Sequence, residues 1–167
     1  MAIGTIDGLL TKLRPTVLCP TEEDWITIDR KISLPNDYKS FVSQFGAGQI
    51  DFFISIMSPL GDLLTANGQL NKTCAELRTK FPEIFDFNLY PEKGGAFQFG
   101  STDNGDPLVW ETNEDPDGWT VGIIPSRRNE LERFQCGFEE FLVSLLDRRI
   151  EPDCFPQDFL DNEHTYH

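Results

Sequence analysis

The chain has 167 residues and a formal net charge of −14, from 28 acidic and 14 basic residues. A surface this acidic argues against nucleic acids and anionic membranes as partners and favours a basic protein. A hydrophobic content of 39% is enough for one domain of this length to bury its own core. We find no segment typical of a signal peptide or a membrane span. We therefore expect a soluble, cytoplasmic single domain over residues 1–167, with a monomer favoured.

Two helices are predicted before residue 33. The first is short and amphipathic, with apolar side chains at helical spacing ahead of Pro15: Ile6, Leu9, Leu10 and Leu13. The second begins at Thr21, which suits an N-cap, and three acidic residues follow in its first turn. We expect it to bury one stripe of side chains: Trp25, Ile28 and Ile32.

The stretch LPNDYKSFVSQFGAG, residues 34–48, predicts a third helix. Pro35 suits the first turn, and the apolar residues share one face: Leu34, Tyr38, Phe41, Val42 and Phe45. A glycine-rich turn can hold phosphate, but such turns precede a helix, whereas Gly46-Ala47-Gly48 follows one. We therefore expect Gly46 to end the helix in a left-handed conformation and Gly48 to permit close backbone packing as a strand begins.

The rest of the chain becomes richer in strands. QIDFFISIMSP, residues 49–59, predicts one strand buried on both sides, and a helix that ends at Pro82 follows, with its apolar face at Leu70, Cys74, Leu77 and Phe81. The segments AFQFG, PLVWET and WTVGIIP predict an antiparallel meander, and ELERFQ is a candidate edge strand. A last helix is predicted over residues 138–146. Helices on both sides of an antiparallel run predict the α+β class.

Residues for catalysis or metal binding are scarce. His164 and His167, the only two histidines, fall in an acidic segment, residues 151–167, which we expect to be an exposed tail. Their spacing beside Asp161 and Glu163 could hold a metal only loosely. The four cysteines occur singly and are interpreted as reduced thiols: Cys19, Cys74, Cys136 and Cys154.

A calcium loop is a second metal candidate, within TDNGDPLVWE. Its oxygen donors would be Asp103, Asn104, Asp106 and Glu111, but their spacing does not fit the loop pattern. A hairpin turn at Asn104-Gly105 explains the same residues. We therefore expect no catalytic residue, no cofactor and no metal.

The acidic residues are concentrated between Asp103 and Asp117, where no Lys or Arg occurs. A solvated hairpin tip is one interpretation, and an acidic protein-binding surface with aromatic anchors is the other. The candidate partner-binding residues are Asp103, Asp106, Trp110, Glu111, Glu114, Asp115, Asp117 and Trp119. For Trp110, burial in the core is the favoured alternative.

Several of these features together resemble the SUKH superfamily, which includes bacterial immunity proteins and fungal cell-wall synthesis regulators. The resemblance covers roughly residues 21–146. It rests on Trp25, on LPNDYKSFVSQFGAG running into QIDFFIS, on Pro59, on TDNGD leading to PLVW, and on FEEFLVSLL. The stretch LYPEKGGAFQFGSTDNGD resembles bacterial rather than fungal members.

This resemblance implies a curved, mostly antiparallel sheet wrapped by helices. It also implies a non-enzymatic protein that binds and neutralises a toxin domain of a bacterial polymorphic or contact-dependent toxin system. The superfamily has no catalytic motif to transfer, and its binding surface varies between members. A basic nuclease is the toxin class that the charge would suit. The alternatives are a regulatory or scaffolding interaction module, a carboxylate-based hydrolase and a small-molecule sensor.

Overall fold

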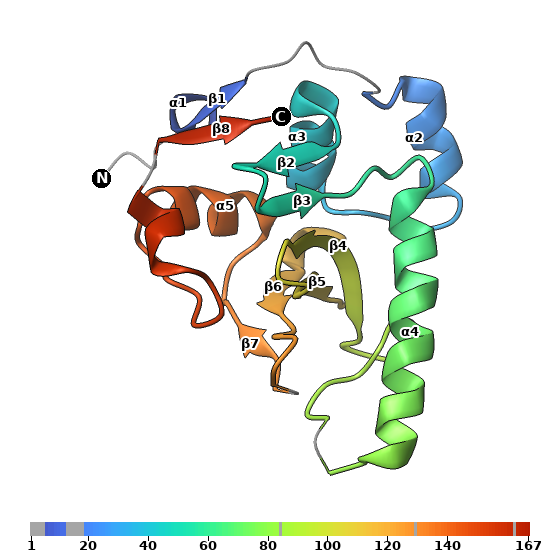
Figure 1. The fold of residues 1–167 in the computed structure, drawn as a ribbon. Coiled ribbons are helices and arrows are strands. Elements are labelled where there is room, and N and C mark those ends of the chain that lie inside the picture. The colour runs from blue at the N-terminus through green and yellow to red at the C-terminus, as the bar shows by residue number, and fades with distance from the viewer. Residues whose placement is uncertain (1–5, 13–18, 84, 129, 162) are drawn as a thin grey trace.

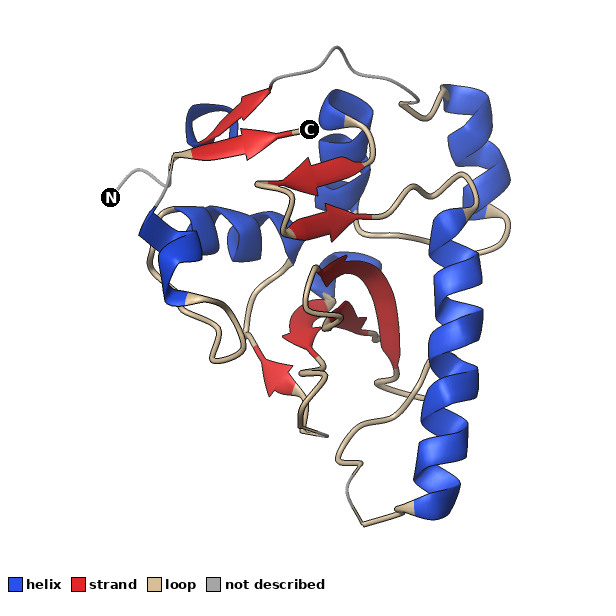
Figure 2. Ribbon diagram, in the orientation of Figure 1, coloured by secondary structure: helices blue, strands red, loops and turns tan. Residues whose placement is uncertain are grey.

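The fold is α+β, as predicted, and is built on one open sheet (Figures 1 and 2). The computed structural model describes residues 6–12, 19–83, 85–128, 130–161 and 163–167. The helices in this part of the chain are α1 (Ile6–Leu9), α2 (Glu22–Asp29), α3 (Asn36–Phe45), α4 (Asp62–Lys80) and α5 (Phe138–Leu146), with 3₁₀ turns η1 (Pro116–Gly118) and η2 (Gln157–Asp161). The strands are β1 (Leu10–Lys12), β2 (Gly48–Ile50), β3 (Ile54–Ile56), β4 (Ala96–Thr102), β5 (Pro107–Glu111), β6 (Thr120–Ile123), β7 (Glu132–Arg133) and β8 (His164–Tyr166).

The sheet has the order β1-β8-β2-β3-β4-β5-β6-β7. Strands β2 to β7 form antiparallel pairs with their neighbours in sequence, so the predicted meander is confirmed and extends further than predicted. The candidate edge strand is confirmed as the two residues of β7. β1 runs parallel to β8 at the opposite edge. None of the helices described is long and apolar enough to cross a bilayer.

Each face of the central sheet packs against helices. Consecutive residues of β5 point to opposite faces, since Leu108 and Trp110 belong to the larger core with α3 and α5, whereas Val109 packs with α4. In the larger core Tyr38 meets Trp110 and Phe138 edge to face, at centroid distances of 5.1 and 5.4 Å. The Tyr38 hydroxyl donates a 2.6 Å hydrogen bond to the Met57 carbonyl. The sheet is therefore buried on both sides at its centre.

The helix predicted from residues 34–48 is confirmed as α3, with every residue of its predicted apolar face buried. Gly46 has φ 74°, the left-handed region that favours glycine, and it donates to the Val42 carbonyl. A Cβ at Gly48 would lie 2.4 Å from the carbonyl oxygen of His167, so the expected close packing is confirmed. Gly46 therefore ends α3, and Gly48 leaves room for the neighbouring residues Tyr166 and His167.

The segment predicted as one strand over residues 49–59 is instead a hairpin of β2 and β3. Its turn places Asp51 at φ 51° and Phe52 at φ 56°. The prediction was wrong because neither residue is a glycine or an asparagine, the usual signal of a turn with positive φ.

The C-terminal residues do not form an exposed tail, which corrects a second prediction. β8 lies inside the sheet between β1 and β2, and His164 is only 6% exposed. Nδ1 of His164 is 2.5 Å from Asp51 Oδ2, and the backbone N–H of Thr165 donates to the other oxygen of Asp51 at 2.7 Å. Just before β8, Phe155 and Phe159 are buried against Phe53.

Two further helices differ from prediction. The first helix is the single turn α1, and Leu10 already belongs to β1; Leu13 and Pro15 lie outside the described residues. In α4 the predicted face is buried at Leu70 and Cys74 but is 37% exposed at Leu77 and 51% at Phe81.

The helix α2 largely agrees with prediction. The capping box of Thr21 and Asp24 is present, Ile28 and Ile32 are buried, and Trp25 is half-buried.

Candidate functional site

The eight predicted partner-binding residues do not form one patch. Six of them divide between two turns, residues 103–106 between β4 and β5 and residues 112–119 between β5 and β6, and the other two, Trp110 and Glu111, lie on β5 itself. At about 3.3 Å per residue, the five residues of β5 hold these turns on the order of 16 Å apart, at opposite ends of the strand.

Three of the eight residues are buried: Trp110, Asp106 and Trp119. Trp110 and Asp106 are almost completely covered and cannot meet a partner. Trp110 is 0% exposed within the aromatic core, as its alternative interpretation expected. Asp106 is 2% exposed, and its carboxylate accepts from the Thr102 hydroxyl at 2.7 Å and from the Ser126 backbone N–H at 2.7 Å. It holds the Asn104-Gly105 hairpin turn, where Gly105 has φ 85°. As surface contacts these two predictions were wrong, because the hairpin and the core use both side chains.

Two other acidic residues have internal structural partners. Glu111 pairs with Arg133 across 3.0 Å. Asp117 accepts two 2.8 Å hydrogen bonds from Asn36, one from its backbone and one from its side chain, at the N-terminus of α3. Asp117 therefore caps a helix and is a poor choice for testing partner binding.

Glu114, Asp115 and Trp119 meet a second loop, residues 90–94, around a shallow hollow of about 790 Å³. We call it the Trp119 hollow; it is lined by Tyr90, Pro91, Glu92, Lys93, Gly94, Thr112, Asn113, Glu114, Asp115 and Trp119. Trp119 is 5% exposed and is fixed by a 2.9 Å hydrogen bond from Nε1 to the Asn113 carbonyl. Sequence reasoning missed residues 90–94 because no local signal says which distant loop will lie beside Trp119.

The charges around the Trp119 hollow are mainly negative. Glu92 is paired with Arg78 across 3.3 Å, and Lys93 contributes one positive charge. Glu114 and Asp115 are exposed, and no ion pair joins either of them to another described residue. Two exposed carboxylates without an ion-pair partner attract a Lys or Arg side chain.

Asp103, the last of the eight, is exposed in the other turn. Its backbone N–H donates to the Phe53 carbonyl at 2.8 Å. Phe53 in turn contacts Phe155 and Phe159, so the C-terminal acidic segment is close to this turn. The structure thus places Asp103 on the side of Phe155 and Phe159 and separates it from Glu114 and Asp115.

A polar hollow of about 340 Å³ near Cys154 is lined by two acidic residues, Asp106 and Asp153. Asp106 lines it but is used by the hairpin, and Asp153 lies 3.8 Å from Arg128. Burial raises the pKa of Glu132, whose Oε1 accepts from the Asp153 backbone. Burial also raises the pKa of the Cys154 thiol to about 12, and that of Cys136 to about 11, so both thiols are protonated at neutral pH.

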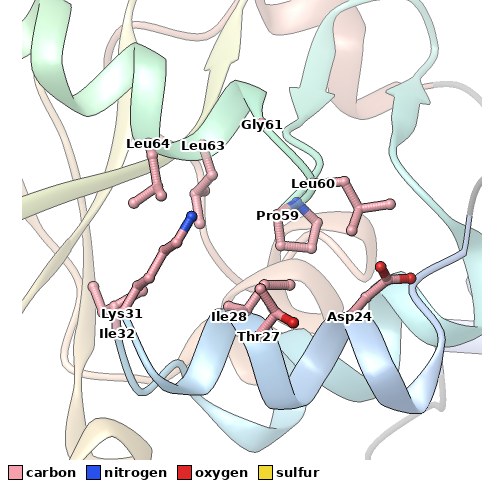
Figure 3. A pocket seen from close by; sticks show the side chains of 10 residues that line it. All are labelled: Asp24, Thr27, Ile28, Lys31, Ile32, Pro59, Leu60, Gly61, Leu63 and Leu64. Atoms are coloured by element: carbon pink, nitrogen blue, oxygen red, sulfur yellow. The ribbon is translucent and has the colours of Figure 1, made fainter.

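An apolar hollow of about 210 Å³ lies between α2 and the start of α4 (Figure 3). We call it the α2–α4 hollow; it is lined by Asp24, Thr27, Ile28, Lys31, Ile32, Pro59, Leu60, Gly61, Leu63 and Leu64. Sequence reasoning missed the α2–α4 hollow, because the positions of Leu60 and Leu64 in the sequence do not indicate that their side chains are exposed. Their exposure of 44% and 41% becomes visible only in the fold.

Within the described part of the chain, no three His, Cys, Asp or Glu side chains are grouped as a metal site would need. All four cysteines are free thiols. Comparisons of the chain with family models, with curated proteins and with solved structures returned no match in any of the three. The observations that bear on function are therefore the charges and hollows of the surface.

Proposed function

We propose that the protein is a non-enzymatic immunity protein of the SUKH type, which neutralises a toxin domain by binding it through the Trp119 hollow. The observation that carries this proposal is the pair of exposed acidic side chains, Glu114 and Asp115, beside a hollow that the buried Trp119 also lines. A Lys or Arg side chain of the toxin would enter the hollow and pair with these carboxylates. The net charge of −14 would steer a basic toxin, such as a nuclease, toward this surface.

Neutralisation follows if the bound side chain belongs to the toxin's own substrate-binding cleft. A nuclease needs basic groups to hold phosphate, and an acidic protein that occupies them excludes the substrate. Such binding needs neither a cofactor nor a metal. It accounts for the acidic surface without any catalytic residue in this chain.

The test is co-expression with the toxin domain encoded beside this gene, together with binding kinetics on the purified pair. The unaltered chain should restore growth, and its association rate should fall as NaCl rises. A regulatory or scaffolding protein would not restore growth. If growth is not restored while both proteins are soluble, the immunity role is wrong for that pair.

The site is tested by a double substitution, Glu114→Lys with Asp115→Asn. Asparagine keeps the acceptor that Asp115 offers to the Asp117 backbone N–H, so η1 is preserved. We expect the affinity to fall about tenfold or more, mainly through the association rate. The control, Glu76→Lys with Glu151→Gln, changes the net charge equally outside the hollow. Equal losses in both variants would show that the Trp119 hollow is not the contact.

A further inference from the structure

The α2–α4 hollow combines an apolar interior with one charge at each end. Its floor is the buried side chains of Ile28, Ile32 and Leu63, and its rim is Leu60 and Leu64, which the fold leaves partly uncovered. The volume of about 210 Å³ suits a small molecule or a single side chain. An apolar hollow of this kind gains most from an aliphatic occupant.

The positive end is Lys31. Figure 3 shows its ammonium nitrogen directed across the hollow toward Leu63 and Leu64 of α4. Its side chain makes no hydrogen bond or ion pair with the residues that the structure describes. An ammonium group held above aliphatic side chains with no internal partner is available to a carboxylate.

The negative end is Asp24, close to Leu60 in Figure 3. Asp24 Oδ2 accepts from both the backbone and the hydroxyl of Thr21 at 2.8 Å, which fixes the carboxylate and leaves Oδ1 free. These two hydrogen bonds lower the pKa of Asp24, so it is ionised at neutral pH. Lys31 is seven positions after Asp24 and lies just beyond the end of α2, so the two charges are at different ends of the hollow (Figure 3).

We propose that the α2–α4 hollow binds a small aliphatic zwitterion, with a carboxylate at Lys31, a chain of methylenes over Ile28 and Leu63, and an ammonium at Asp24. The two opposite charges fix the direction of the ligand, whose own charges must be separated to meet both ends of the hollow. A ligand with both charges on one carbon would reach only one end. This site is independent of the Trp119 hollow and does not require the proposed function.

The probe is ε-aminocaproate, whose methylene chain separates a carboxylate from an ammonium. Caproate and hexylamine are matched controls, because each keeps the chain and lacks one charge. Titration followed by amide NMR should shift residues 27–32 and 60–64, and ε-aminocaproate should bind about tenfold more tightly than either control. No shift at millimolar probe, or equal binding of caproate, overturns the proposal.

Variants separate the contributions of the two ends. Lys31→Met keeps an unbranched side chain, one atom shorter and without the charge, and Asp24→Asn keeps an acceptor for Thr21. Lys31→Met should lower the affinity for ε-aminocaproate about tenfold and leave that for hexylamine unchanged. Asp24→Asn should also lower the affinity for ε-aminocaproate about tenfold, and it should leave the affinity for caproate unchanged. If both variants bind all three compounds as the unaltered protein does, the charges play no part and the proposal is wrong.

The place of binding is tested by filling the hollow. Leu64→Phe adds bulk at a half-exposed rim position and should abolish the shifts. Leu77→Phe makes the same change on the same helix at similar exposure, outside the hollow, and should leave binding intact. Binding that survives Leu64→Phe would locate the probe elsewhere and overturn the assignment.

Discussion

At the scale of single residues, Phe52 is held in an unfavourable conformation. Its φ of 56° belongs to the left-handed region, where a side chain meets the backbone, and its ring is 57% exposed. The ring stacks on His167 with a centroid distance of 3.7 Å. Asp51 fixes the same turn by accepting from Thr165 and contacting His164. Contacts with the C-terminal strand thus stabilise a turn that its own residues disfavour.

Phe52→Gly should stabilise the protein. Glycine has no Cβ and adopts φ 56° without strain, so the free energy of unfolding should rise by about 1 kcal/mol, less any contribution of the His167 stack. Denaturant unfolding measures the change. The control is Phe81→Gly, at a comparably exposed phenylalanine with φ −138°, which should destabilise. Destabilisation by both variants would contradict the prediction, because the relief of strain at Phe52 would then be smaller than the loss of its contacts.

At the scale of elements, two helices receive their N-terminal caps from elsewhere in the chain. The N-cap positions of α3 and α5 are Pro35 and Gly137, and neither offers a side-chain acceptor. Asp117 caps α3 through Asn36, and Asp37 of α3 accepts from the Glu139 backbone N–H at the start of α5 at 3.0 Å. Because free N–H groups at helix starts need acceptors, these carboxylates join η1, α3 and α5.

Asp117→Ala should therefore destabilise the protein although the residue is exposed. Loss of an N-terminal cap costs about 1 kcal/mol, measured as a lower denaturation midpoint at unchanged m-value. Asp103→Ala removes an equally exposed acidic side chain that caps no helix, and should change stability by less than about 0.5 kcal/mol. Equal effects of the two alanine variants would contradict the capping role.

Elements with strong local patterns could be predicted, and elements that depend on distant partners could not. The apolar spacing of Tyr38, Phe41 and Phe45 determines α3 regardless of its surroundings. β8 is three residues long and exists only because β1 and β2 lie on either side of it. The candidate site likewise depends on distant parts of the chain, which local sequence patterns do not bring together. Composition located Glu114, Asp115 and Trp119, but it could not bring residues 90–94 beside them or separate Asp103 from them.

At the scale of the whole molecule, repulsion within the net negative charge should lower the free energy of unfolding. The net charge of −14 places many carboxylates within range of one another, and the exposed ion pairs contribute little each. The fold therefore contains an electrostatic repulsion that dissolved ions can reduce. The class α+β could be predicted from the order of the segments, whereas this repulsion follows from composition alone.

The melting temperature should rise between about 0.01 M and 0.15 M NaCl, because the Debye length falls from about 30 Å to about 8 Å and screens the repulsion. Thermal unfolding followed by circular dichroism measures the rise. The same titration near pH 4.4, the sequence pI, is the control and should show little change. A melting temperature that falls with salt at neutral pH would mean that attractive pairs outweigh the repulsion.

The position of β8 also determines the order in which the molecule can assemble as it is synthesised. β1 is joined to the sheet through β8, so the first strand of the chain must wait for the last one before it gains a partner. The meander from β2 to β7 needs no such wait, since its pairs are neighbours in sequence. On the ribosome, β1 should therefore remain unpaired until residues 164–166 have left the exit tunnel.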